Sequence, residues 1–240
     1  MRIKILANPK KEWAKALSLE IAGALKPRHQ VVRKGADATI CIGGDGTVLY
    51  AHYKGRIEGA VLGIGSEKSY ICQLRNTDWK ELLIPLIESE RTMSIMTLQC
   101  TLGEKTIVAL NDFLIHATHY RVAELEVSYG SGGAKQMSAF EGDGMIISSA
   151  LGSAAYAYSA GGEKLPPTER KISLVPICPY KRAFGPKILS EDGKVAVKVG
   201  SDCAFIVDGI YVRELRKGEV VQAEKGSDLV FFAGVGKHDS

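Results

Sequence analysis

The sequence predicts an α/β protein with two domains, the first alternating strands and helices and the second mainly β. Through residues 1–95 strand-like and helix-like segments follow one another, an order typical of a parallel sheet with helices on its faces. After about Arg91 apolar residues recur at every second position, as in MTLQCTL (96–102), which is typical of half-buried strands. We therefore expect a Rossmann-like α/β domain over residues 1–95 and a β-sandwich-like domain over residues 96–240.

The elements of the first domain follow from the spacing of apolar residues. Residues 2–7 are expected to form a strand and residues 10–26 a helix, because Trp13, Leu17 and Ile21 recur on one face. Thr77 and Asp78 are typical residues for opening a helix. The remaining strands are expected at 31–32, 38–42 and 60–64, and the remaining helices at 47–53 and 77–88.

In the second domain, strands are expected at 96–102, 122–127 and 195–199, with YGSGGAKQ (129–136) as a hairpin tip. One helix is expected at 153–160. The last segment, SDLVFFAGVGKHDS (227–240), predicts a final strand and a tail that could pack back on the first domain.

Composition excludes several classes of function. The net charge is +4 with dispersed lysines and arginines, which argues against a nucleic-acid partner. No apolar run is long enough for a membrane span, and no signal peptide is predicted. Five scattered cysteines favour reduced thiols, so we expect a cytoplasmic protein. No residue is singled out as a metal ligand, and the H-x-x-H of His116 and His119 is not expected to hold a metal because it lacks a third ligand.

The segment CIGGDGTVLY (41–50) carries the first functional signal. Gly43, Gly44, Asp45, Gly46 and Thr47 lie between a predicted strand and a predicted helix, where open α/β sheets bind ligands. Glycines let backbone amides approach phosphate oxygens. An aspartate there suits Mg²⁺ binding or removal of a proton from an attacking hydroxyl. The pattern suggests a kinase, and the alternative is a structural Asp-Gly turn with Thr47 as the helix cap.

Two further segments strengthen this interpretation. EGDGMIISSALGSAAYAYSAGG (141–162) combines an Asp-Gly pair, a strand and a small-residue turn into a helix. There Tyr156 and Ser159 could contact a flat ring, although close packing of the helix on the sheet is an alternative. In ALNDFLI (109–115), Asn111 and Asp112 interrupt an apolar strand, either as a strand end or to bind a sugar hydroxyl.

Taken together and in this order, the segments resemble the NAD kinase family, the inorganic polyphosphate/ATP-NAD kinases. GGDGT (43–47) is similar to that family's GGDGT, and Asn111-Asp112 to its Asn-Glu or Asn-Asp pair. Residues 142–162 resemble its DG and TPTGSTAY segments. PICPYKRAFGPKIL (176–189) and Asp208-Gly209 resemble later family segments.

The resemblance implies phosphoryl transfer from ATP or polyphosphate to the 2′-hydroxyl of the adenosine ribose of NAD, giving NADP. It also implies a divalent cation such as Mg²⁺ and a homodimer or homotetramer, and it leaves NAD and NADH both open as acceptors. Carried over, Asp45 is the expected base, and the flanking glycines are expected to hold phosphate. The expected contacts to NAD come from Asn111, Asp112, Asp143, Ala155, Tyr156 and Ser159.

The sequence also departs from the family pattern. TPTGSTAY becomes SALGSAAY (149–156), in which Ala154 replaces a threonine, and the histidine of PICPH becomes Tyr180. Two alternatives therefore stay open. One is a related GGDGT kinase for another hydroxyl, on a lipid or a different nucleotide. The other is a non-catalytic NAD(P)-binding regulatory protein.

Overall fold

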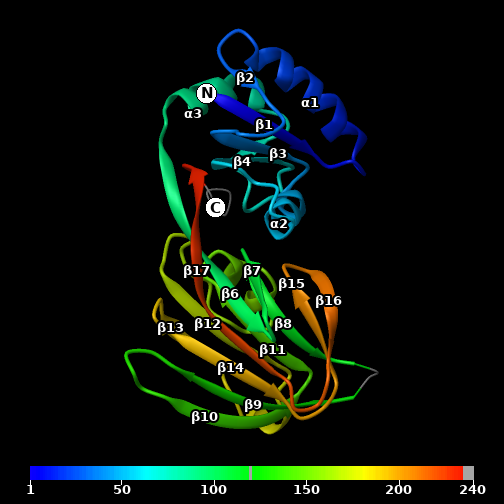
Figure 1. Ribbon diagram of the computed structural model, residues 1–240, viewed down its shortest axis with the longest axis vertical. Helices are drawn as coiled ribbons and strands as arrows, with labels where there is room; N and C mark the ends of the chain where they lie inside the picture. Colours follow the sequence, from blue (N-terminus) through cyan, green and yellow to red (C-terminus); the bar gives the residue numbers. More distant parts are fainter. Residues whose placement is uncertain (119–120, 235–240) are drawn as a thin grey trace. The chain divides into compact units, whose positions relative to one another are not determined.

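A computed structural model describes residues 1–118 and 121–234, which fall into two compact units. The first unit contains Met1–Ile95 and residues 229–234, and the second contains Met96–Asp228. The chain leaves the first unit within strand β6 (Thr92–Leu102) and returns to it within strand β17 (Val220–Phe232). Both strands are labelled in Figure 1.

The first unit is built on a parallel sheet with the strand order β17, β4, β3, β1, β2, and β5 pairs with β4. Its own strands are β1 (Arg2–Ala7), β2 (Gln30–Val31), β3 (Ala38–Ile42), β4 (Ala60–Gly65) and β5 (Leu74–Arg75). Its helices are α1 (Glu12–Leu25), α2 (Asp45–Tyr53) and α3 (Trp79–Glu88). The predicted alternation of strands and helices is confirmed.

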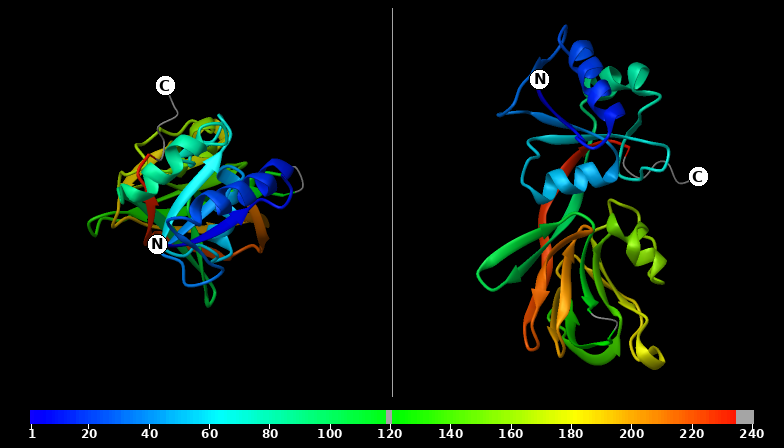
Figure 2. Two further views of the ribbon diagram at one scale, coloured as in Figure 1. Left: turned by 90° about the horizontal axis from the view of Figure 1, so that it is seen from above. Right: turned by 90° about the vertical axis from the view of Figure 1, so that its right-hand side faces the viewer.

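Helices α1 and α3 cover one face of this sheet, and α2 lies on the other (Figures 1 and 2). Leu17 and Ile21 of α1 pack with Leu83 of α3 over Ile40 of the central strand. Burial of one such side chain stabilises the fold by roughly 2 kcal/mol. Helix α2 is not part of this layer and begins at Asp45, shortly after the carboxyl end of β3 at Ile42.

The second unit contains two sheets made almost entirely of antiparallel pairs. In one, β10, β9, β14 and β17 are neighbours, with β6 pairing β17 and β7. In the other, the order is β13, β12, β11, β8, β15, β16. The bounds are β7 (Lys105–Ala109), β8 (Asp112–Ala117), β9 (Ala123–Gly130), β10 (Gln136–Gly142), β11 (Gly144–Ser149), β12 (Lys171–Ile177), β13 (Lys187–Ser190), β14 (Lys194–Val199), β15 (Cys203–Val207) and β16 (Ile210–Leu215).

The central strand β11 is buried at every position. Short helix α4 (Tyr156–Ser159) covers one face, where Ala157 packs with Leu114 and Ile146 (Figure 2). The opposite face of β11 lies toward the other sheet of the unit (Figure 1). The predicted β-rich second domain is confirmed, and this packing fixes the entrance of α4 against the end of β11.

One expected helix, and one alternative considered for the glycine turn, differ from the structure. The helix expected at 153–160 is a 3-10 turn, η1 (Gly152–Ala154), followed by α4, because Ala155 has the non-helical angles φ −94° and ψ −124°. Helix α2 begins at Asp45 after Gly44, so Thr47 lies inside its first turn rather than capping it. A second 3-10 turn, η2, spans Tyr180–Arg182.

Across the described residues, none of the helices combines the length and the apolar character that crossing a membrane requires. The five cysteines are free thiols, four of them buried and Cys178 exposed. The final residues 235–240 of the predicted tail lie outside the described residues.

Candidate functional site

The glycine turn lies between β3 and α2, where only glycine fits. Gly43 and Gly44 have φ angles of 142° and 92°, which side chains disfavour. A Cβ on Gly43 would lie 2.5 Å from both Asn8 Cβ and Thr47 Oγ1. Asn8 Nδ2 also donates to Thr47 Oγ1 at 3.2 Å. The end of β1 and the first turn of α2 therefore close tightly around the glycines.

The amides of Gly43 and Gly44 both donate to the Ile64 carbonyl, at 2.9 and 3.2 Å. This differs from the expectation that the glycines preceding Asp45 offer their own amides to phosphate. Because the first amides of a helix have no intrahelical acceptor, the amides of Asp45 and Gly46 are the ones placed to bind an anion.

The half-buried Asp45 carboxylate is held by the loop that follows β4. Its Oδ2 accepts from the amide of Tyr70 at 2.7 Å, and its Oδ1 accepts from those of Ile71 at 2.9 Å and Cys72 at 3.3 Å. Each carboxylate oxygen has two lone pairs, so Oδ2 keeps one acceptor position beyond these amides. The backbone thus orients the carboxylate and leaves it able to take a proton.

Cys72 lies against this carboxylate as a buried thiol. Burial and then the charge of Asp45 raise the pKa of the Cys72 thiol well above its usual value. The thiol therefore stays protonated beside Asp45 and serves as a neutral neighbour rather than as a nucleophile.

The sequence did not single out the cation that stands beside the turn. Lys11 Nζ donates to the Gly43 carbonyl at 2.7 Å and lies 5.7 Å from the centroid of the Trp13 ring. A Cβ on Gly44 would be 3.9 Å from the same nitrogen. In the sequence Lys11 looks like an ordinary surface lysine, and only the fold brings it to a turn 32 residues away.

In the second unit, Asn111 lies between β7 and β8 with its backbone engaged on both sides. Its amide donates to Asp208 Oδ1 at 2.7 Å, and its carbonyl accepts from the Ser149 amide at 2.8 Å. Its side-chain Oδ1 is buried and has no hydrogen-bond partner among the described residues. A buried acceptor left unpaired costs free energy, so a donor on a ligand would satisfy it.

Asp112 begins β8 and is buried, with 7% of its surface exposed. Burial and then the charge of Asp208 raise the pKa of the Asp112 carboxyl to about 7. Burial also raises the pKa of Asp208, to about 6, while three backbone amides act in the opposite direction. Two carboxyl groups that share a dry site in this way retain a proton closer to neutral pH than exposed carboxyl groups do.

The serines of the helix entrance hold its backbone together. Ser149 Oγ donates to the Leu110 carbonyl at 2.6 Å and accepts from the Gly152 amide at 3.1 Å. Ser153 Oγ donates to the Ala150 carbonyl at 2.6 Å. The segment that leads into α4 is therefore hydrogen-bonded to the loop that contains Asn111, and both serines are fully buried.

The other predicted contacts of this unit lie in two places. Ala155, Tyr156 and Ser159 are exposed in the segment 152–159, whose first residue, Gly152, approaches Asn111 so closely that a Cβ there would clash with the Asn111 carbonyl oxygen. Asp143 lies before the opposite end of β11, where Gly144 pairs with His116, whereas Ser148 pairs with Asp112. At 3.3 Å per residue the two ends are about 16 Å apart. The structure thus brings Gly152, the first residue of η1, against the Asn111 backbone, whereas Asp143 precedes the other end of β11.

Within residues 1–118 and 121–234, no three or more His, Cys, Asp or Glu side chains are grouped to hold a metal ion. His119 of the H-x-x-H lies outside the described residues.

Each unit thus carries features of a nucleotide site. One has a fixed aspartate and a lysine at a helix N-terminus, and the other has an unpaired amide oxygen on Asn111 and an exposed tyrosine, Tyr156. This combination of fold and polar groups is typical of phosphoryl-transferring nucleotide enzymes.

Comparisons with known proteins identify the family. The family described as "ATP-NAD kinase C-terminal domain" matches residues 110–233. The NAD kinase of Clostridium perfringens is 32% identical over 204 residues, which cover 80% of this chain and 73% of the relative. The NAD kinase of Prosthecochloris aestuarii is 27% identical over 210 residues, 83% of this chain and 72% of the relative. The chain belongs to the NAD kinase family, and the resemblance found in the sequence is confirmed.

Solved structures agree on the fold. The NAD kinase from Archaeoglobus fulgidus in complex with ATP matches with a TM-score of 0.82 and 21% identity, covering 98% of this chain and 94% of its own. Yeast NADH kinase complexed with NADH matches with a TM-score of 0.84 and 17% identity, covering 99% and 84%.

Proposed function

We propose that the protein transfers the terminal phosphoryl group of ATP to the 2′-hydroxyl of the adenosine ribose of NAD, forming NADP and ADP. As a member of the NAD kinase family the chain is an enzyme that phosphorylates NAD. The observation that supports the assignment of its base is the Asp45 carboxylate, which three backbone amides orient and whose Oδ2 accepts from only one of them.

In the proposed step, the 2′-oxygen forms a bond to the γ-phosphorus as the bond to the β–γ bridging oxygen breaks. The hydroxyl proton passes to Asp45 Oδ2, and ADP leaves with the electron pair of the broken bond. Such transition states need alignment and charge neutralisation more than a strong nucleophile. The amides of Asp45 and Gly46 at the start of α2 supply positive potential for the phosphate oxygens.

We assign the acceptor NAD to the second unit. The unpaired Oδ1 of Asn111 and the Asp112 carboxyl would bind hydroxyl or amino hydrogens of the adenosine half. The ring of Tyr156, 41% exposed, would stack on adenine beside Ala155 and Ser159. Asp143, about 16 Å along the strand direction, would contact the nicotinamide half.

We assign the donor to the glycine turn, where Gly43, Gly44, Gly46 and Thr47 leave room for phosphate, and to Lys11. A divalent cation fits this arrangement as an ion carried by the phosphates of ATP, because Mg²⁺ is usually held by one or two carboxylates plus substrate phosphates. When bound, the ion neutralises phosphate charge. Asp45, the carboxylate of the turn, would be the residue that holds the ion.

Replacing Lys11 by methionine is expected to raise the KM for ATP about tenfold or more, because a charge-assisted contact to phosphate is lost. The KM for NAD should change much less. Steady-state kinetics with each substrate varied in turn measure both values. Lys10→Met, one residue earlier in the same segment, is the matched control. Equal effects of the two substitutions would contradict a specific role for Lys11.

We further propose that the protein is cytoplasmic and forms a homodimer or homotetramer. Light scattering of the purified protein would test the oligomeric state. ATP is to be compared with polyphosphate as the donor, and NAD with NADH as the acceptor.

The decisive assay incubates purified protein with Mg²⁺, ATP and NAD and measures NADP by an NADP-specific dehydrogenase. Formation of NADP supports the proposal. Tight NAD binding without turnover would favour a non-catalytic regulatory protein, and transfer only to another hydroxyl would favour a kinase with a different acceptor.

A further inference from the structure

The hairpin of β15 and β16 ends in a tight turn at Asp208 and Gly209. Both residues have positive φ angles, 50° and 76°, and the flanking Val207 and Ile210 are paired. This is the geometry of a two-residue turn in which Asp-Gly is strongly preferred. The backbone conformation of Asp208 is thus explained by the turn itself. The turn does not use the Asp208 side chain.

The Asp208 carboxylate instead binds the loop between β7 and β8. Its Oδ2 accepts from the Leu110 amide at 2.9 Å, and its Oδ1 accepts from the amides of Asn111 at 2.7 Å and Asp112 at 3.1 Å. In return the Asp208 amide donates to the Asp112 carbonyl at 3.0 Å. With only 7% of Asp208 exposed, these four bonds form a buried clamp on three consecutive residues.

Two of the three clamped residues, Asn111 and Asp112, are the ones assigned to the proposed acceptor. Without the Asp208 carboxylate, three neighbouring amides would lose their acceptor, and buried amides without partners are costly. The loop would then rearrange to satisfy them. Because Asn111 is an element-end residue with an unpaired side-chain oxygen, such a rearrangement would move that oxygen away from its ligand.

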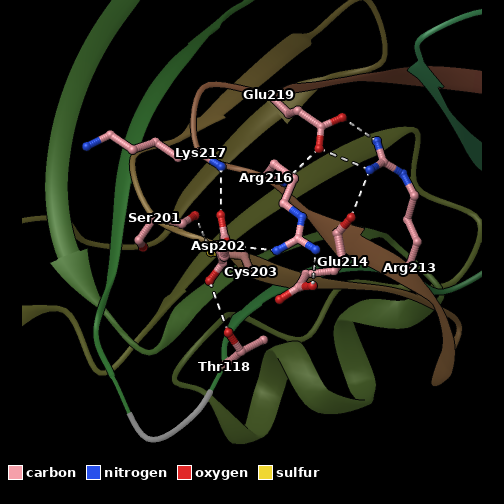
Figure 3. Close-up of polar contacts among 9 residues, drawn as sticks. All are labelled: Thr118, Ser201, Asp202, Cys203, Arg213, Glu214, Arg216, Lys217 and Glu219. Atoms are coloured by element: carbon pink, nitrogen blue, oxygen red, sulfur yellow. Dashed lines mark hydrogen bonds and ion pairs between the residues drawn. The ribbon is translucent and has the colours of Figure 1, made fainter.

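The other end of the hairpin is fixed by ion pairs (Figure 3). Asp202 accepts from Arg216 Nη1 and from the Lys217 amide, both at 2.9 Å. Arg213 and the Arg216 amide bind the Glu219 carboxylate at 2.6 to 3.0 Å. These contacts anchor the base of the hairpin, so the turn at its tip has a defined position from which to hold the Asn111 loop.

We propose that Asp208 is a positioning residue for the acceptor NAD: without touching the ligand, it holds Asn111 and Asp112 in the conformation that binds the adenosine half. The inference rests on the proposed function, because the acceptor assigned to this loop is NAD. It adds a residue nearly one hundred positions away in the sequence from the loop that it controls.

The test is Asp208→Asn, which keeps the shape of the side chain and tolerates the positive φ. Its amide group would point a donor at a backbone donor, so at least one clamp bond is lost. We expect the KM and Kd for NAD to rise about tenfold or more, while the KM for ATP stays within about threefold. Amide hydrogen exchange of Leu110, Asn111 and Asp112 should become faster in the ligand-free protein.

The matched control is Asp202→Asn, the same chemical change at the base of the same hairpin. It removes one of the two carboxylate acceptors used by Arg216 and Lys217, and it should lower the melting temperature without changing the Kd for NAD. The proposal is overturned if Asp208→Asn leaves the exchange of the three amides unchanged, or if both variants weaken NAD binding equally. A wild-type protein that forms no NADP would instead refute the kinase function, and the comparison of NAD affinities would still decide the role of Asp208.

Discussion

Replacing Asp45 by asparagine is expected to lower kcat for NADP formation by about a thousandfold, since general-base contributions are typically 10²–10⁴-fold. An amide oxygen cannot accept the 2′-hydroxyl proton at neutral pH, and the substituted group carries no charge to attract a cation. Rapid-quench and steady-state assays of NADP measure the loss. The Kd for NAD, whose proposed contacts lie in the second unit, should stay within about threefold.

The control for this variant must address the loop that Asp45 holds. Asparagine would place a donor against one of the amides of Tyr70, Ile71 or Cys72, so some destabilisation is expected. Asp78→Asn is the matched change in the same unit, because Asp78 Oδ1 accepts from the Arg75 amide at 2.8 Å. If Asp78→Asn lowers kcat as much as Asp45→Asn does, the loss would reflect loosening of the unit and the role of Asp45 as base would be refuted.

The second large effect concerns pH and the buried Asp112. Its pKa is raised to about 7 in the folded protein from an ordinary value of 3.8. Between these values the folded state binds a proton more tightly than the unfolded state, so stability falls as pH rises from about 4 to 7 and is then constant. At 1.36 kcal/mol per pKa unit, a shift of this size corresponds to a loss on the order of a few kcal/mol, to which the charge of Asp208 also contributes.

Asp112→Asn should remove this contribution, so the unfolding free energy of the variant should fall less between pH 5 and pH 8 than that of the wild type. Both tryptophans, Trp13 and Trp79, belong to the first unit, so their fluorescence does not report the second. Amide exchange in β8 and β11 at the two pH values is the appropriate measurement. Glu126→Gln, on the exposed side of β9, serves as the control. Identical pH dependence in the wild type and Asp112→Asn would contradict the effect.

The sequence allowed the fold class to be predicted because apolar spacing is a local signal. The change from helical to alternating spacing near residue 95 is visible without any long-range contact. The glycine turn could also be predicted from the sequence, because Gly43 and Gly44 adopt backbone angles that only glycine takes readily. These features depend on residues close together in the chain.

The features that could not be predicted depend on residues far apart. Lys11 meets Gly43, and Asp208 meets Leu110, only after the strands have paired. The loop amides that hold Asp45 lie 25 to 27 residues beyond it. The break at Ala155 was missed because small helix-forming residues surround it, while the buried hydrogen bonds of Ser153 tie the turn before it to other segments.

The interrupted course of the first unit has a consequence for the order of assembly. Phe231 of β17 pairs with Val61 of β4, whereas β5 covers this edge of β4 only at Ile64 and Gly65. The part of the edge at Val61 therefore lacks its β17 partner until residues 229–232 have been synthesised. The ribosome therefore completes the second unit, Met96–Asp228, before β17 can pair with β4 in the first unit. Unpaired strand edges promote association with other chains. In the nascent protein this part of the β4 edge stays unpaired until β17 has been synthesised.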